Sequence, residues 1–197
     1  MNYLAHLYLS GNSETLMLGN FVADSVKGGQ MKGFSEAVQK GILLHRSIDT
    51  YTDQHAVVEE SKKRMRQTHG KYAGVIVDIF FDHYLAVRWL DYHKEPLFDY
   101  SAWVYQVLKN HHATMPLRAQ QFYGYMVSRN ILYAYREVAG IDQVLRGMAH
   151  RARFVSGMEN ASEMLLKHYD AFEAEFHAFF PDLEAHVQAK IHSLNEG

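Results

Sequence analysis

Apolar side chains recur along most of the chain at intervals of three and four residues, which is the spacing of one face of an α-helix. Strict alternation of apolar and polar residues is rare, whereas Leu, Ala, Met, Glu, Gln and Lys, which favour helices, are abundant. Prolines occur only at positions 96, 116 and 181, and each lies where an apolar pattern breaks. The pattern therefore predicts an all-α fold with long helices.

We expect one compact helical bundle over residues 1–197, with about seven to eight helices. The longest predicted helix covers residues 35–67. The segment 73–90 is the most hydrophobic and is predicted to be the central helix. Pro181 is expected to begin the last helix, because proline suits the first helical turn. The other predicted elements are a short opening segment near 2–10 and helices over 12–27, 98–112, 117–138, 141–150, 158–179 and 182–194.

The composition agrees with a globular domain and excludes several classes of protein. The length of 197 residues fits one domain, and the apolar content of 48% argues against disorder. A net charge of −2 gives no sign of a nucleic-acid partner. No apolar run reaches the roughly 18 residues of a membrane span, and no signal peptide is recognisable, so a cytoplasmic protein is expected. The chain has no cysteine, so any metal must be held by oxygen and imidazole ligands.

The stretch GILLHRSIDTYTDQH, residues 41–55, combines a helical apolar pattern with groups that bind protons or metals. His45, Asp49 and Asp53 follow one another at steps of four, so they form a ladder along one face of the predicted helix. A face that only packed against a core would carry apolar residues at these steps. The ladder therefore indicates a site.

A second ladder lies in the predicted central helix, where Asp78 and Asp82 are also four residues apart and His83 follows. A lone carboxylate among valine, isoleucine and phenylalanine is costly to bury unless it is paired or bound to a metal. His6 and Asp24 are likewise single ionisable groups in apolar neighbourhoods. The two ladders could face each other across a divalent ion, for which Mn²⁺, Mg²⁺ or Fe²⁺ suits this ligand set better than a structural zinc.

Ordinary structural explanations exist for each group taken singly. A histidine in an apolar helix is more often a hydrogen-bonded core residue than a ligand, and this applies to His6. Asp49 and Asp53 could be surface carboxylates that face solvent or pair with a neighbouring arginine. Asp78 could pair with an arginine elsewhere, and the Asp–His pair of the central helix could be partly exposed. The joint occurrence of two ladders favours a metal site.

Four motifs, in their order and spacing, resemble the acyl carrier protein phosphodiesterase family: MNYLAHLYLS, GNFVADSVKG, GILLHRSIDTYTD and DIFFDHYLAVRW. The later GMAHR and HYDAFEAEFHAFFP are similar to the C-terminal half of that family. The resemblance implies an enzyme that removes 4′-phosphopantetheine from holo acyl carrier protein and returns the apo form. It also implies an HD-like, all-helical fold that depends on Mn²⁺ or a similar ion. The chain has DH where an HD domain has HD, so the ligand register of HD domains cannot be copied directly.

Within this resemblance, the metal is expected to bind a phosphate oxygen and to lower the pKa of a bound water. Asp24 and Asp78 are predicted as catalytic residues, either as further ligands or as supports of the ligands. His6 is predicted to orient a ligand or to protonate the leaving serine alkoxide. The predicted metal ligands are His45, Asp49, Asp82 and His83.

Positive charges give modest support for a phosphate-bearing substrate, because arginine offers bidentate geometry to phosphate. The densest basic run, SKKRMRQTHGK at 61–71, is the predicted docking patch for the acidic carrier protein. Solvated surface charges would explain these residues as well. The predicted substrate-binding residues are Lys27, Arg46, Arg129, Arg136, Arg151 and Arg153.

Two other functions fit the same residues. One is an HD-type phosphohydrolase that acts on a nucleotide or another small phosphodiester. The other is a non-catalytic helical module that binds a partner helix through Met148, Met158 and Met164, although methionine stripes belong to cores more often. The sequence leaves the oligomeric state and the number of bound ions open.

Overall fold

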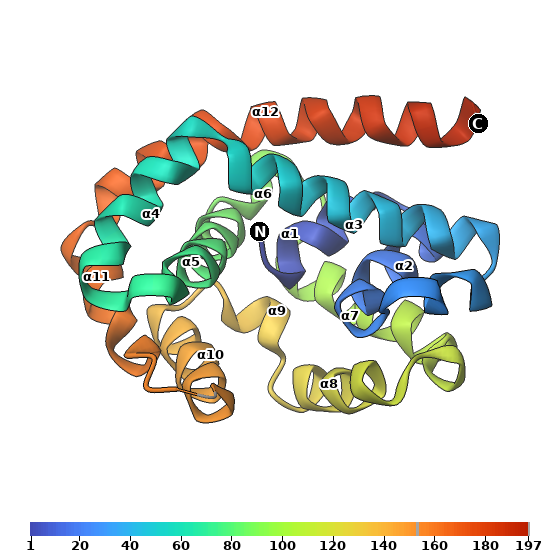
Figure 1. Ribbon diagram of the computed structural model, residues 1–197, viewed down its shortest axis with the longest axis horizontal. Helices are drawn as coiled ribbons and strands as arrows, with labels where there is room; N and C mark the ends of the chain where they lie inside the picture. The colour runs from blue at the N-terminus through green and yellow to red at the C-terminus, as the bar shows by residue number, and fades with distance from the viewer. Residues whose placement is uncertain (153, 197) are drawn as a thin grey trace.

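The computed structural model describes residues 1–152 and 154–196, and these residues form an all-α fold without strands, as predicted (Figure 1). Twelve α-helices, rather than about seven to eight, make up this part of the chain. None of the helices described is both long and apolar enough to cross a membrane. The helices are α1 (Tyr3–Tyr8), α2 (Glu14–Val22), α3 (Glu36–Gln54), α4 (Ala56–His69), α5 (Ala73–Val87), α6 (Trp89–Tyr92), α7 (Leu97–Asn110), α8 (Leu117–Ser128), α9 (Ile131–Ala134), α10 (Val138–Arg151), α11 (Ala161–Lys167) and α12 (Tyr169–Glu196).

Two backbone breaks account for much of the higher helix count. The helix expected over 35–67 is wrong in extent, because the extended backbone of His55 (φ −75°, ψ 130°) separates α3 from α4. The ring of His55 packs against Phe179 of α12, with 5.0 Å between ring centroids, so the chain turns where α12 crosses it. The helix expected over 117–138 is also divided, because Asn130 is left-handed (φ 45°) between α8 and α9.

Pro181 does not begin a helix, and the prediction of a separate helix over 182–194 is wrong. The proline lies inside α12, which continues through it. Its missing N–H leaves the carbonyl of His177 without the usual helical partner. Phe180 and Leu183 are both fully buried on either side of the proline, so packing against the core holds the helix together across that gap.

The helix α5 is the centre of the core, as its hydrophobicity predicted. All of its residues from Ile79 to Ala86 are buried. Phe80 and Phe81 meet rings of α12 edge to face, at centroid distances of 5.2 and 5.9 Å. The helices α1 and α4 also contact α5 (Figure 1). Any residue of α1 therefore has a fixed position relative to the core.

The helices α2 and α3 pack backbone against backbone. A Cβ atom at Gly19 would lie 2.2 Å from the carbonyl oxygen of Val38, and one at Gly41 would lie 2.4 Å from that of Leu16. Only glycine fits at both positions, because any side chain would push the two helices apart. The close approach places Asn20 of α2 against the polar ladder of α3.

The helix α1 is anchored on α5 by Asp82. The carboxylate of Asp82 accepts hydrogen bonds from the backbone N–H groups of Asn2, Leu4 and Ala5, at 3.1, 2.7 and 3.3 Å. Burial raises the pKa of Asp82 to about 7, and the nearby terminal ammonium and the N–H donors oppose that rise. These N–H groups belong to the first turn of α1, which has no helical partners for them.

A second anchor lies one turn earlier on α5, where Asp78 holds the ammonium group of Met1 at 3.0 Å. The buried Asp82 and the partly buried Asp78 of the second ladder therefore both have partners, as the cost of removing a carboxylate from water required. Those partners are the N–H donors and the ammonium group at the start of α1, in place of the expected shared ion.

We predict that Asp82→Ala lowers the free energy of unfolding by about 3 kcal/mol or more, because it leaves three N–H groups, two of them buried, without an acceptor. Urea denaturation in the presence of EDTA measures this without any contribution from metal. The exposed Asp91 of α6 provides a control, since Asp91→Ala should change stability by less than about 0.5 kcal/mol. A loss below about 1 kcal/mol for Asp82→Ala would refute the anchoring role.

Candidate metal centre

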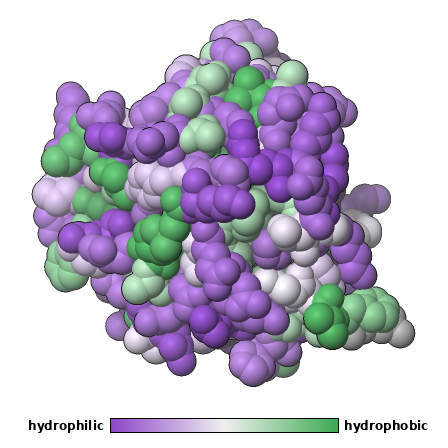
Figure 2. Space-filling view, turned by 90° about the vertical axis from the view of Figure 1, so that its left-hand side faces the viewer, coloured by the Kyte–Doolittle hydropathy of each residue, from purple (hydrophilic) through white to green (hydrophobic). Residues whose placement is uncertain are grey.

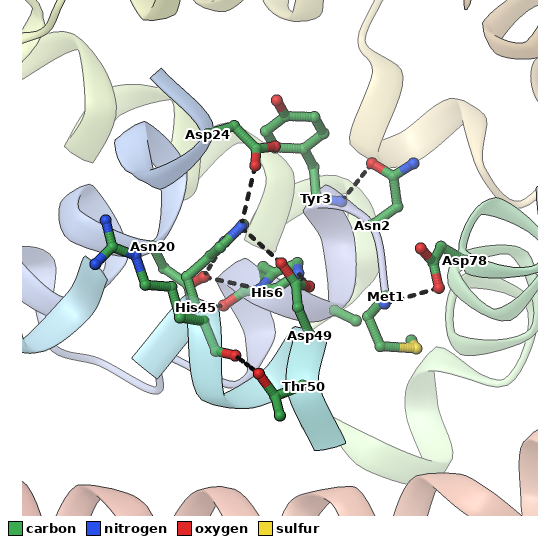
Figure 3. A network of polar contacts seen from close by, with 12 residues as sticks. Met1, Asn2, Tyr3, His6, Asn20, Asp24, His45, Asp49, Thr50 and Asp78 are labelled. Carbon is green, nitrogen blue, oxygen red and sulfur yellow. Dashed lines mark hydrogen bonds and ion pairs between the residues drawn. The ribbon is translucent and has the colours of Figure 1, made fainter. Parts of the chain in front are cut away.

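Three potential metal ligands converge where α1 meets α3 (Figure 3). His6 comes from α1, and His45 and Asp49 come from successive turns of α3; one ligand atom of each lies within 4.8 Å of the others. The Nε2 atoms of His6 and His45 lie 3.0 and 3.1 Å from the two carboxylate oxygens of Asp49. The part of the chain that the structure describes contains no second group of three such ligands.

Asn20 fixes the orientation of both imidazoles. Its Nδ2 donates to the carbonyl oxygen of His6 at 2.7 Å and to the hydroxyl of Ser10 at 3.1 Å, which determines which way the amide faces. Its Oδ1 lies 2.8 Å from Nδ1 of His6 and 3.0 Å from Nδ1 of His45. An amide oxygen only accepts, so both Nδ1 atoms carry the hydrogen and both Nε2 atoms face Asp49.

This arrangement brings hydrogen-bond acceptors face to face. When Nδ1 of a neutral imidazole carries the hydrogen, Nε2 presents a lone pair, and here that lone pair meets a carboxylate oxygen of Asp49. Nε2 of His45 also lies 3.4 Å from Oδ1 of Asp24, on the short 3-10 helix Ala23–Ser25. Although buried, this nitrogen makes no hydrogen bond of acceptable geometry within the described residues. A cation shared between these atoms, either a proton or a metal ion, resolves the conflict.

The pKa values of the cluster reflect the same demand for a cation. Burial lowers the pKa of His45, but the contacts with Asp24 and Asp49 outweigh it and raise the value to about 9. The contact with His45 lowers the pKa of Asp24. Burial raises the pKa of Asp49, yet the two imidazoles hold it well below its usual range. Burial and the neighbouring His45 lower the pKa of His6.

The donor set fits a divalent metal ion. Two imidazole nitrogens and one or two carboxylates, with an orphaned buried Nε2 among them, match the ligands of Mn²⁺ and Fe²⁺ sites in proteins. Asp24 and Asp49 keep 60% and 43% of their side chains exposed, so the site remains open on one side. An open side is what a metal centre needs if it is to meet a substrate.

The cluster lies in the wall of a cavity of about 820 Å³. The α1–α3 side of this cavity carries the carboxylates and imidazoles, and Asp53 and Asp78 line it as well. The other side is formed by α8 and α10, which lie across from α3 in Figure 1. The cavity is therefore bounded by two separate groups of helices with different chemistry.

Arg118 of α8 and Arg151 of α10 supply positive charge on that other side. The hydroxyl of Tyr3 is influenced by both sides, because partial burial and Asp24 raise its pKa while the two arginines lower it. Neither arginine forms an ion pair within 4 Å among the described residues; Arg151 instead lies over the ring of Tyr125, at 5.6 Å. Two unpaired guanidinium groups thus face the acidic cluster across the cavity.

The structure places Asp82 and His83 outside the cluster. The carboxylate of Asp82 accepts hydrogen bonds from the backbone N–H groups at the start of α1. The ring nitrogens of His83 lie 2.7 Å from the carbonyl oxygen of Tyr135 and 2.9 Å from the hydroxyl of Tyr169, so both are occupied. Asp53 lines the cavity but binds the buried ammonium group of Lys62 at 2.6 Å. Of the first ladder, His45 and Asp49 join the cluster.

The predicted substrate-binding cations divide in the same way. Arg151 lines the cavity, whereas Lys27, Arg46, Arg129 and Arg136 are exposed and do not. Arg153 lies outside the described residues.

The basic run 61–71 is largely neutralised. Four of its five cations form ion pairs, and Lys71 lies over the rings of Tyr72 and Phe154. The ion pairs are Lys62–Asp53, Lys63–Glu60, Arg64–Glu175 and Arg66–Glu59.

The side of the molecule seen in Figure 2 is mostly hydrophilic, with separate apolar patches.

Two residues of the site were not predicted from the sequence. Asn20 lies in the quoted motif GNFVADSVKG, and a polar amide in so apolar a helix was a usable signal for a buried hydrogen-bonding role. Arg118 follows Pro116 in a polar stretch and has no distinguishing neighbour, so only the fold reveals that it faces the cavity.

Known proteins resemble this chain over almost its full length. The family model described as "Acyl carrier protein phosphodiesterase" matches residues 1–183. Curated proteins with that same description include one from Enterobacter sp. (strain 638), 33% identical over 98% of this chain and 100% of that protein. Others come from Photorhabdus laumondii, 30% identical over 92% of each chain, and Escherichia coli K12, 31% identical over 96% and 99%. No solved structure matches, so the HD-like fold stays a prediction.

We predict that Asn20→Ala weakens Mn²⁺ binding by about 10- to 100-fold, because both imidazoles lose the acceptor that orients them. Isothermal titration calorimetry measures the affinity, and the thermal midpoint of the metal-free protein shows whether the variant still folds. Asn12→Ala, at an exposed position before α2, is the matched control and should keep the affinity of the unaltered protein. An Asn20→Ala variant that folds and binds Mn²⁺ within twofold of normal would contradict the orienting role.

Proposed function

The chain belongs to the acyl carrier protein phosphodiesterase family, a family of enzymes, and we propose that it hydrolyses holo acyl carrier protein to the apo form and 4′-phosphopantetheine with the help of a divalent metal. The observation that carries the proposal is that a cluster of imidazoles and carboxylates and a pair of arginines lie on opposite sides of one cavity. The His6, His45 and Asp49 cluster suits a metal, and Arg118 with Arg151 suits a phosphate.

His6, His45 and Asp49 would hold the ion, with Asp24 as a further ligand. Mn²⁺ is the proposed metal, with Mg²⁺ or Fe²⁺ as alternatives, because the set mixes imidazole with carboxylate and has no thiolate. When bound, such an ion lowers the pKa of a coordinated water and neutralises charge on a phosphoryl oxygen. Asn20 keeps both imidazoles turned toward the ion by accepting from their Nδ1–H groups.

The two arginines would bind the phosphodiester group. A guanidinium donates two parallel hydrogen bonds to phosphate oxygens and keeps its charge at any working pH. The guanidinium group of Arg151 lies over the ring of Tyr125, and this cation–π contact helps to hold it in position. The diester would then sit between the arginines and the acidic cluster, with its reacting phosphorus near the cavity mouth.

The hydrolysis exchanges one P–O bond for another. A water oxygen forms the new bond to phosphorus and the water loses a proton, while the bond between phosphorus and the carrier serine oxygen breaks and the serine oxygen gains a proton, so the reaction consumes one water and no net proton is needed. His6 is not suited to donate this proton, because its Nδ1–H is held by Asn20 and its Nε2 faces Asp49. The geometry therefore speaks against the predicted proton-donor role of His6, and its place beside His45 and Asp49 supports a role as a metal ligand, which was not among its predicted roles.

The two rival functions do not agree equally well with the observations. A non-catalytic binding module does not agree with membership of an enzyme family, and Met158, one of its three supposed contact residues, is buried at 3% exposure. A phosphohydrolase of nucleotides or other small diesters would use the same cluster and arginines. Substrate competition separates it from the proposed function.

The proposed reaction can be tested by incubating the protein with holo acyl carrier protein and Mn²⁺ and following the mass of the carrier by mass spectrometry. We expect the carrier to lose one phosphopantetheine group, and we expect EDTA or His45→Ala to abolish the loss. A carrier that stays holo with every metal tried, while nucleotides or small diesters are cleaved, would refute the proposed substrate.

Arg118→Ala and Arg151→Ala should each raise KM for the holo carrier by about 10-fold or more, because each removes a charged hydrogen-bond donor to the phosphate. Steady-state kinetics with a range of carrier concentrations measures the effect. Arg129→Ala is a matched control, since Arg129 also lies over Tyr125, at 5.3 Å, but does not line the cavity. Equal effects of all three substitutions would indicate general charge attraction in place of specific phosphate contacts.

A further inference from the structure

The cavity has an exposed mouth and a buried inner end. At the mouth, Asp24 keeps 60% of its side chain exposed, and Arg118 and Arg151 are exposed as well. At the inner end, Ile131 and Met158 are each only 3% exposed. The exposed carboxylates and guanidinium groups therefore lie at the cavity mouth, whereas the imidazoles of His6 and His45 and the apolar residues are buried farther from solvent.

The inner end forms an apolar chamber between α5, α9, α10 and the 3-10 helix Met158–Asn160. Among the residues that the structure describes, the only titratable side chain that we assign to it is that of Tyr135. The inner chamber is lined by Val75, Ile131, Tyr135, Val144, Met148 and Met158.

Tyr135 gives this chamber one polar group, its hydroxyl. Its side chain is 1% exposed, and the residue is part of the cavity lining. A hydroxyl in the wall of a cavity is a suitable hydrogen-bond partner for a ligand that enters it. The hydroxyl can donate to a carbonyl oxygen or accept from an amide N–H.

We infer that the inner chamber receives the pantetheine arm of the carrier protein, with the phosphate held at the mouth. This inference rests on the proposed function, because it takes the phosphodiester as the group that the arginines bind. The arm is a narrow chain with a gem-dimethyl group, two amides and a terminal thiol, and a cavity of about 820 Å³ lies within the range of pockets that enclose such molecules.

The chemistry of the walls agrees with this direction of entry. The methyl groups and methylenes of the arm meet valine, isoleucine and methionine, and the flexible thioethers of Met148 and Met158 adapt to an irregular thiol-bearing end. An amide of the arm can pair with the Tyr135 hydroxyl. The folded carrier is too large to enter, so it stays outside the mouth, where Asp24 and the arginines are exposed.

Binding of two phosphate monoesters to the Mn²⁺-loaded protein tests the inference. 4′-Phosphopantetheine and methyl phosphate share the head group, and only the first carries the arm. We expect calorimetry to show at least 10-fold tighter binding of 4′-phosphopantetheine, and we expect Met148→Trp, which fills the chamber, to remove that advantage. Leu166→Trp adds the same ring at an exposed position of α11 and should leave the advantage intact.

Tyr135→Phe provides a second variant that removes one oxygen without filling the chamber. It should reduce the advantage of 4′-phosphopantetheine over methyl phosphate by about three- to 10-fold. Equal affinities of the two ligands for the unaltered protein would overturn the inference, as would an advantage that survives both substitutions in folded variants.

Failure of the inference and failure of the proposed function are distinguishable. If the holo carrier is hydrolysed but the arm contributes nothing to binding, the arm lies outside the chamber and the inference alone is wrong. If the arm contributes to binding but the carrier is never hydrolysed, the chamber is retained and the proposed reaction is wrong.

Discussion

The candidate site depends on one amide group. Asn20 accepts from the Nδ1–H groups of two histidines that come from different helices, and its own N–H groups are held by Ser10 and by the backbone of α1. The amide therefore cannot turn, and neither imidazole can change its tautomer without losing a buried hydrogen bond. Nε2 of His6 and Nε2 of His45 consequently meet the carboxylate of Asp49, which is an unfavourable contact until a cation joins them.

The position of Asn20 is itself imposed by the backbone. Gly19 and Gly41 allow α2 and α3 to approach more closely than any other pair of residues would permit at those positions. Asp82 and Asp78 fix α1 on α5, so that His6 reaches the same point from a third direction. The two carboxylates of α5 thus support the cluster at a distance, because they hold the helix that carries His6.

The cavity separates charges that would otherwise neutralise each other. The acidic cluster lies on α1, α3 and the turn that carries Asp24, whereas Arg118 and Arg151 lie on α8 and α10. The gap between them prevents a direct ion pair, so both groups of charges remain open to the cavity.

The sequence by itself determined the helical class, the central place of α5 and the presence of a polar ladder on α3, because hydrophobic spacing and the cost of burying a charge are local properties of the chain. It also contained the motifs that resemble the family. The breaks at His55 and Asn130 and the passage of α12 through Pro181 were decided by tertiary packing, since His55 turns where Phe179 meets it and Phe180 and Leu183 hold α12 together.

Tertiary structure also decided which carboxylate joins the candidate metal cluster and which one anchors α1. Asp49 and Asp82 look alike in the sequence, each one helical turn beyond another ionisable group. The carboxylate of Asp82 meets the three N–H groups of α1, whereas that of Asp49 meets two imidazoles whose hydrogens already point elsewhere. Sequence spacing shows that a buried carboxylate needs a partner, but the partner comes from a segment far along the chain, and only the fold decides which one it is.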